Sequence, residues 1–134
     1  MKKRFKIIYD FNETDPPKPH ESKVAKIIAE YFESDVQFIR KTACSSPDIV
    51  VMKTHQTWEI KSPLGNGKRT ISNNLRNASR QSKFIILDLS RCKMNNSRAL
   101  SRINEYSKKG NPNIKKLLII DKKGHVVDNI LQIK

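Results

Sequence analysis

The sequence predicts an α/β fold in which a mixed central β-sheet is flanked by helices. Three observations lead to this prediction. The chain has 134 residues, the length of one ordinary domain. Short apolar runs of strand length occur among longer segments with helical periodicity, and no internal repeat, low-complexity tract or linker separates them. Because strands occur both in succession and next to helices, the sheet is expected to be only partly parallel.

The first half of the chain predicts strands on both sides of one helix. Weak alternation over residues 5–9 indicates a short strand, and the prolines that follow indicate a loop. Apolar residues three and four positions apart predict a helix over 20–33 with one face in the core. The apolar runs 36–39 and 49–52 predict strands, and alternation over 57–61 predicts a partner strand for the second run.

The second half of the chain predicts two further helices and a closing hairpin. A thin apolar line over 68–81 indicates a helix, and the continuous apolar run 84–89 indicates a buried strand. A third helix is expected over 97–107, followed by a hairpin of strands 117–121 and 125–131. The predicted order is therefore β, α, β, β, β, α, β, α, β, β.

The charge of the chain predicts a polyanionic partner. It holds 27 Lys and Arg against 13 Asp and Glu, a net charge of +14. Acids are nearly missing from residues 60–104, where Asp88 stands alone among ten basic residues. One face of the fold is therefore expected to be almost purely positive, which favours nucleic acid. No apolar run approaches the roughly 18 residues that a membrane-spanning helix needs.

The cysteines and the N-terminal segment restrict the site chemistry and the compartment. Cys44 and Cys92 stand apart, without a CxxC motif or a nearby histidine pair, so neither a zinc site nor a structural disulfide is expected. The apolar stretch near the N-terminus is too short for a signal peptide. The chain is therefore expected to act in a reducing cytoplasm, on its own or after delivery by something that it lacks.

The segment SPDIVVMKTHQTWEIKSP, residues 46–63, contains the candidate catalytic residues. A tight symmetric turn within residues 53–56 would place Asp48 opposite Lys61 and Val50 opposite Glu59. Asp48, Glu59 and Lys61 would then emerge on one face of the sheet. A turn of odd length or a bulge would separate them. The plain alternative is that Glu59 and Lys61 are the solvated side of an ordinary strand.

Together, these residue types suit metal-dependent cleavage of a phosphodiester. Mg²⁺ prefers oxygen ligands, which the carboxylates of Asp48 and Glu59 and the backbone carbonyl of Ile60 can supply. Such an ion acidifies its bound water and neutralises charge on the phosphate. The Lys61 ammonium, two residues beyond Glu59, can position that water or stabilise the pentacovalent state.

Glu21 is a further candidate because it falls on the core-facing side of the first predicted helix. It precedes Val24 by three residues and Ile28 by seven. It is expected to point toward the metal, directly or through water. The alternative is that the carboxylate stabilises the first turn of the helix through the helix dipole.

The helix over 68–81 predicts a surface that binds phosphates. Its polar face lacks acids, and a solvated basic helix is the alternative. Two basic residues at its start and one after its end are weaker candidates. The full set of predicted nucleic-acid-binding residues is Lys68, Arg69, Asn73, Arg76, Asn77, Arg80 and Lys83. Trp58 and Ile60 are expected to belong to the core rather than to stack on bases.

These motifs resemble two related groups of nucleases. Glu21, the PD pair at Asp48 and the EIK triplet at 59–61 resemble the PD-(D/E)xK superfamily, whose restriction-endonuclease-like core has the order α, β, β, β, α, β. Over residues 21–91, a narrower likeness rests on PDIVV, EIKSP, ISNNLRNASRQS and FIILDLS. These four segments resemble the C-terminal toxin domains of CdiA-type contact-dependent growth inhibition and related polymorphic toxins that cleave tRNA.

The resemblance implies an activity, a site and a partner. It implies a metal-dependent endoribonuclease that cleaves tRNA with Mg²⁺ or Mn²⁺. Glu21, Asp48, Glu59 and Lys61 would form its centre, and a cognate immunity protein would block it. Residues 1–134 would form one nuclease domain, with a core at about 20–91 and a helix and hairpin extension over 92–134. As an antibacterial toxin domain, it would act in the cytoplasm of a target cell.

Two other functions compete with this interpretation. A DNA nuclease of the resolvase or restriction type could use the same metal centre, because the chemistry does not require the ribose hydroxyl. A non-catalytic nucleic-acid-binding module would use the basic surface alone. It would be indifferent to Mg²⁺ and to replacement of Asp48 or Glu59.

Overall fold

The helices and strands follow one another in the order that the sequence predicts. The computed structural model describes residues 5–9, 17–39, 47–109 and 113–129. Within these residues, the helices are α1 (Pro19–Phe32), α2 (Thr70–Ser79) and α3 (Asn96–Lys109). The strands are β1 (Ile7–Ile8), β2 (Val36–Phe38), β3 (Ile49–Val51), β4 (Gln56–Lys61), β5 (Phe84–Asp88), β6 (Lys116–Ile120) and β7 (Val126–Asn129). From α1 to β5 the order is α, β, β, β, α, β, as expected.

The strands of the described residues form one mixed sheet whose spatial order, β1 to β7, is also the sequence order. Strand β3 is antiparallel to both of its neighbours, β2 and β4, whereas β4, β5 and β6 run parallel to one another. The outer pairs differ, because β1 is parallel to β2 and β7 is antiparallel to β6. The prediction of a mixed, partly parallel sheet is therefore confirmed.

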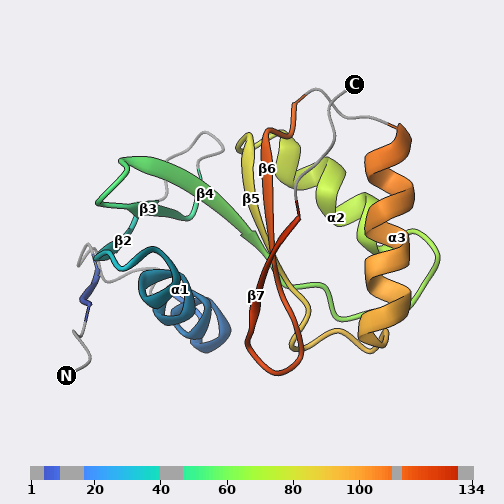
Figure 1. Cartoon of the computed structure of the whole chain (residues 1–134), viewed down its shortest axis with the longest axis horizontal. Coiled ribbons are helices and arrows are strands. Elements are labelled where there is room, and N and C mark those ends of the chain that lie inside the picture. Colours follow the sequence, from blue (N-terminus) through green and yellow to red (C-terminus); the bar gives the residue numbers. More distant parts are fainter. Residues whose placement is uncertain (1–4, 10–16, 40–46, 110–112, 130–134) are drawn as a thin grey trace.

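Strand β4 joins the two halves of the sheet (Figure 1). Its first residues, Gln56 to Trp58, pair with β3, and its last residues, Glu59 to Lys61, pair with β5. The candidate catalytic residues of β4 thus begin where pairing with β3 stops. At this point one edge of β4 loses its strand partner, and its backbone groups become available to other residues.

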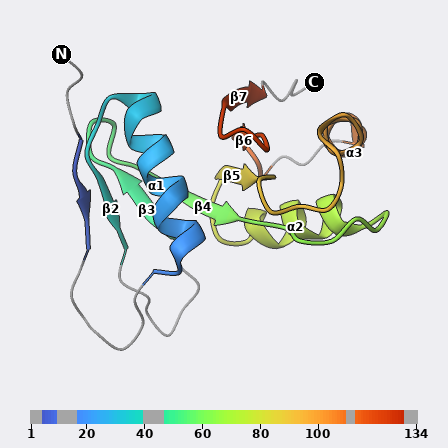
Figure 2. The same cartoon turned by 90° about the horizontal axis from the view of Figure 1, so that it is seen from below.

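Helices cover both faces of the sheet and create two hydrophobic clusters (Figure 2). On one face, α1 buries Val24, Ala25, Ile28 and Ala29 against residues of β2, β3, β4, β5 and β6. On the other face, α2 and α3 pack against β5 and β6. The continuous apolar sequences of β5 and β6 reflect this burial on both sides.

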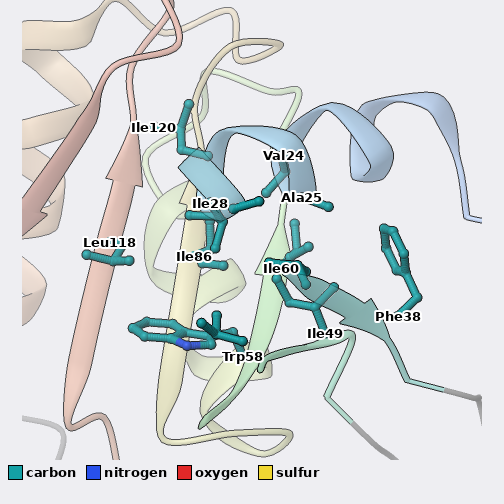
Figure 3. Packing of buried hydrophobic residues seen from close by; sticks show 13 residues of the cluster. Val24, Ala25, Ile28, Phe38, Ile49, Trp58, Ile60, Ile86, Leu118 and Ile120 are labelled. Atoms are coloured by element: carbon teal, nitrogen blue, oxygen red, sulfur yellow. The ribbon is translucent and has the colours of Figure 1, made fainter. Parts of the chain in front are cut away.

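Trp58 lies inside the cluster beneath α1 (Figure 3). Its side chain is buried, and its ring lies 5.7 Å from that of Phe32 and 5.4 Å from that of Phe84. Ile60 belongs to the same cluster. The prediction that both residues are core residues is therefore confirmed.

Several predicted boundaries were wrong by one or two residues. The helix predicted over 68–81 begins at Thr70, whose hydroxyl accepts a hydrogen bond from the Gly67 N–H (3.1 Å), and it ends at Ser79. The first strand covers only Ile7–Ile8, and α3 extends the predicted helix at both ends. Residues 130–131 of the predicted last strand lie outside the described residues.

The remaining expectations concern thiols and membranes. Cys92 is buried with a free thiol, and its Sγ donates a hydrogen bond to the Gly65 carbonyl (3.1 Å). Cys44 lies outside the described residues. None of the helices in the described ranges is long and apolar enough to cross a membrane.

Candidate active site at the end of the β3–β4 hairpin

The register of the β3–β4 hairpin differs from the prediction by two residues. Val51 pairs with Gln56 and Val50 with Thr57, whereas Met52 had been expected opposite Thr57 and Val50 opposite Glu59. The turn therefore begins one residue earlier and consists of residues 52–55. Because the shift is even, the expected face of Glu59 and Lys61 is unchanged.

Asp48 is anchored to β4 on both sides of Glu59. Its N–H donates to the Trp58 carbonyl (3.0 Å), and its Oδ2 accepts a hydrogen bond from the Ile60 N–H (2.8 Å). The carboxylate thus occupies the place that a carbonyl of β3 would take if the ladder continued. Asp48 is only 5% exposed, so this hydrogen bond holds the carboxylate at a fixed position beside β4.

Glu59 and Lys61 form an ion pair on the face of β4 opposite α1. The Lys61 Nζ lies 3.4 Å from the Glu59 Oε2, and the two side chains are 28% and 6% exposed. Trp58 and Ile60 alternate with them and belong to the cluster beneath α1. The Glu59 carboxylate is therefore buried beside a lysine that solvent, or a substrate, can still reach.

The types of oxygen at this position are those that a small divalent cation prefers. Asp48 and Glu59 supply two carboxylates, and Mg²⁺ is commonly held by one or two carboxylates together with waters and substrate phosphate. The carbonyl of Ile60 points to the same side of the strand as its N–H, which is the side occupied by Asp48. Among the described residues, no three His, Cys, Asp or Glu side chains gather into a metal-binding group. A site here would therefore rest on two carboxylates and one carbonyl.

Glu21 is not brought together with Asp48 and Glu59. It lies in the first turn of α1, on the helix that covers the opposite face of the sheet from Glu59. Its Oε1 accepts a hydrogen bond from the Lys18 N–H (3.0 Å), which satisfies a backbone donor at the start of the helix. This contact gives Glu21 a helix-capping role, close to the alternative that the sequence left open.

Replacing Glu21 separates its two roles. Glu21→Ala removes the acceptor for the Lys18 N–H, and we expect it to lower the free energy of unfolding by roughly 1 kcal/mol. Glu21→Gln keeps a side-chain acceptor but removes the charge. Thermal unfolding of the two variants, with cleavage assays alongside, tests both roles. The resemblance-based prediction that Glu21 serves the metal requires Glu21→Gln to lose cleavage at wild-type stability.

Helix α2 and the residues that flank it present basic and amide side chains to solvent. Ile71, Leu75 and Ala78 are buried against the sheet and α3. The residues predicted to bind nucleic acid are all exposed: Lys68, Arg69, Asn73, Arg76, Asn77, Arg80 and Lys83. Their exposure is compatible both with phosphate binding and with a simple solvated surface.

Sequence reasoning gave no site role to Asp88, the last residue of β5. Asp88 is 2% exposed, and its Oδ2 accepts a hydrogen bond from the hydroxyl of Ser62, the residue after Lys61 (3.1 Å). Its Oδ1 accepts a hydrogen bond from the Ser90 N–H (3.0 Å). The sequence signal that could have identified Asp88 is its position at the end of the apolar run FIILD. Asp48 similarly stands at the start of an apolar run.

Comparisons with known proteins agree with this architecture. A solved structure described as a CdiA-CT/CdiI toxin and immunity complex from Burkholderia pseudomallei is similar, with a TM-score of 0.60. The match covers 93% of this chain and 98% of the other at 17% sequence identity, which supports a common fold. No curated protein matches the chain. The model of the contact-dependent growth inhibition CdiA C-terminal domain family matches residues 45–126, more than half of the sequence, and the chain therefore belongs to that family.

Proposed function

We propose that this chain is a metal-dependent endonuclease that cleaves tRNA and acts as an antibacterial toxin domain. The observation that carries the proposal is the arrangement at the hairpin end. There the Asp48 carboxylate is fixed by the Ile60 N–H, and Glu59 is paired with Lys61. This arrangement, together with the αβββαβ order, supports membership of the PD-(D/E)xK superfamily. Membership of the CdiA C-terminal domain family supports a role in growth inhibition.

Each residue at the hairpin end has a definite task in this proposal. Asp48, Glu59 and the Ile60 carbonyl would hold Mg²⁺ or Mn²⁺, which supplies an acidified water and neutralises phosphate charge when bound. The Ile60 N–H keeps the Asp48 carboxylate oriented. The Lys61 ammonium stabilises the additional negative charge that the phosphate acquires in the transition state. Its pairing with Glu59 positions it before the substrate arrives.

The proposed substrate is RNA, and specifically tRNA. The exposed basic face of α2 supports a nucleic acid, and the likeness of four segments to tRNA-cleaving toxins supports tRNA. Phosphate contacts fix the position of a nucleic acid without reading its sequence. The choice between RNA and DNA therefore depends on direct assay with both polymers.

A cognate immunity protein is the proposed protein partner. The similar Burkholderia pseudomallei structure is described as a toxin and immunity complex. A bacterium that makes a growth-inhibiting nuclease needs a protein that neutralises it. We therefore expect a gene for a small binding protein to accompany the gene for this chain.

Removing Arg76 of α2 and Arg80, the residue directly after this helix, is expected to weaken substrate binding without affecting the catalytic centre. Arg76→Ala with Arg80→Ala should raise the Kd for tRNA and lower the slope of log K against log salt by about one unit per lost phosphate contact. Fluorescence anisotropy in chelator, at several salt concentrations, measures both quantities. Lys26→Ala with Lys53→Ala removes the same charge from exposed positions outside α2. Equal effects of the two double variants would show that α2 is only a solvated helix.

Production of the chain inside bacteria tests the proposed function. Induction of the wild-type chain is expected to stop growth and to yield discrete tRNA fragments on a denaturing gel. Induction of the Asp48→Asn variant should do neither. Growth arrest with intact tRNA and nicked chromosomal DNA would replace tRNA by DNA as the substrate. Normal growth with intact nucleic acids and abundant folded protein would contradict the nuclease proposal.

A further inference from the structure

A lysine-rich pocket lies on the α1 face of the sheet, at the carboxyl end of β5. Its lining includes Lys23 of α1, Asp88 and Ser90, and Lys122 and Lys123 of the β6–β7 turn. The carboxyl ends of parallel strands are where open α/β sheets commonly bind ligands. Lys23 lies about 100 residues before Lys122 and Lys123 in the sequence. The fold therefore brings them together.

This pocket adjoins the end of β4. Ser62 directly follows Lys61, and its hydroxyl donates to the Asp88 carboxylate that lines the pocket. The loop after β4 is held close to the segment after β5, because the Lys93 N–H donates to the Leu64 carbonyl (3.1 Å). That loop leads to Lys68 and Arg69 at the start of α2, on the other face of the sheet. Basic residues thus flank the end of β4 on both faces.

The charges of the pocket favour an anion. Three exposed ammonium groups surround one carboxylate, an excess of two positive charges. Asp88 is buried and already accepts hydrogen bonds from Ser62 and Ser90, so it anchors the floor while the lysines remain accessible. Several ammonium groups around a cavity with one buried anchor suit a phosphate, which accepts hydrogen bonds on several oxygens.

The turn that carries two of the lysines is fixed rather than loose. Asp121 Oδ1 accepts hydrogen bonds from the N–H groups of Lys123 and His125 (both 2.9 Å). Burial alone would raise the pKa of Asp121, but these hydrogen bonds and the charges of His125 and Lys123 together hold the pKa below its ordinary value. Gly124 adopts a φ of 85°, which favours glycine and closes the turn. Lys122 and Lys123 are therefore presented from a defined backbone.

We propose that this pocket is a phosphate-binding subsite for the RNA strand, at the same end of β4 as Lys61 but on the opposite face of the sheet. The proposal rests on the proposed nuclease function and extends it. The substrate backbone crosses the end of β4, contacting α2 and its preceding loop on one face and Lys23, Lys122 and Lys123 on the other. Such a two-sided grip favours a folded or sharply bent RNA over a straight duplex.

A matched pair of triple variants tests the subsite. The first replaces Lys23, Lys122 and Lys123 with alanine, and the control replaces Lys26, Lys53 and Lys115, which are exposed but do not line the pocket. Both carry Asp48→Asn, and tRNA binding is measured in chelator at several salt concentrations. We expect the pocket variant to lose at least about tenfold in affinity and to lower the salt slope by about two units. The control should lose no more than about threefold.

Asp88→Asn provides a test with the opposite sign. Asparagine can accept from the Ser90 N–H and can donate to the Ser62 hydroxyl, so the floor of the pocket is retained. Loss of the negative charge should tighten tRNA binding roughly two- to fivefold. If the lysines merely balance Asp88, this variant will leave tRNA affinity unchanged. Thermal unfolding confirms that each variant is folded, and lysine-to-glutamine versions replace any that is not.

The outcomes separate this proposal from the nuclease proposal. A pocket triple that binds tRNA no worse than the control triple overturns the subsite, even if the wild-type chain cleaves tRNA. A selective loss of binding supports the subsite even if no cleavage is detected, because the measurement needs no catalysis. Failure of the parent Asp48→Asn protein to bind tRNA at all would also overturn the subsite.

Discussion

Asp48→Asn is expected to abolish nucleic-acid cleavage while leaving the fold intact. Asparagine keeps a side-chain oxygen that can accept the Ile60 N–H, so the end of the hairpin should stay in place. The negative charge that would hold a divalent cation is lost. Because such an ion supplies several kcal/mol of transition-state stabilisation, the cleavage rate should fall at least about a hundredfold. Single-turnover cleavage of labelled tRNA with excess protein measures this rate.

Asp128→Asn is the matched control for this substitution. Asp128 lies on β7 and forms a partly exposed ion pair with Lys116 (3.4 Å), away from the hairpin end. The Asp128→Asn protein should cleave tRNA at the wild-type rate. Asp48→Asn protein that cleaves within about threefold of wild type, with an unchanged melting temperature, would remove Asp48 from the catalytic centre.

Glu59→Gln is expected to cause a loss of similar size through loss of the metal. The substitution preserves the volume of a buried side chain but removes its charge. The affinity for Mn²⁺, measured by isothermal titration calorimetry, should weaken together with the cleavage rate. Glu105→Gln is the control. Like Glu59, Glu105 forms an ion pair with a nearby basic residue, Arg102, but it is exposed on α3. Glu59→Gln protein with wild-type Mn²⁺ affinity would show that Glu59 serves only its ion pair.

Lys61→Met separates the catalytic role of the Lys61 ammonium from the metal-binding role of the Asp48 and Glu59 carboxylates. Methionine retains most of the apolar length of lysine but no charge. If Lys61 stabilises charge in the transition state, the rate should fall while Mn²⁺ affinity stays close to wild type. Unchanged turnover would remove Lys61 from the chemistry.

Periodicity was sufficient to predict the elements of this fold. The spacing of Val24, Ile27 and Ile28 predicted α1, and the apolar run FIILD predicted β5. Such patterns reflect which side of a helix or strand is buried. The buried side shows as a repeat of apolar residues over a few positions, so it can be recognised from local sequence. Alternation along β4 likewise placed Glu59 and Lys61 on the side opposite Trp58.

Features that depend on distant contacts or unusual backbone were not predicted. The predicted hairpin register was wrong because the turn places His55 at a φ of 58°. The presence of a histidine does not predict this conformation. The pairing of Asp88 with Ser62 spans 26 residues and leaves no local pattern. The spacing of Glu21 predicted that it points toward the metal, but spacing could not reveal that the Lys18 N–H would be its partner.

Cleavage by the purified chain tests the central claim most directly. The protein is incubated with total tRNA, single-stranded DNA and duplex DNA, each with Mg²⁺, with Mn²⁺ and with chelator, and with Asp48→Asn alongside. We expect discrete tRNA fragments that require the metal and vanish in the variant, with both DNA substrates intact. Binding of all three polymers without cleavage of any would contradict a catalytic centre at Asp48, Glu59 and Lys61, and would leave a nucleic-acid-binding module.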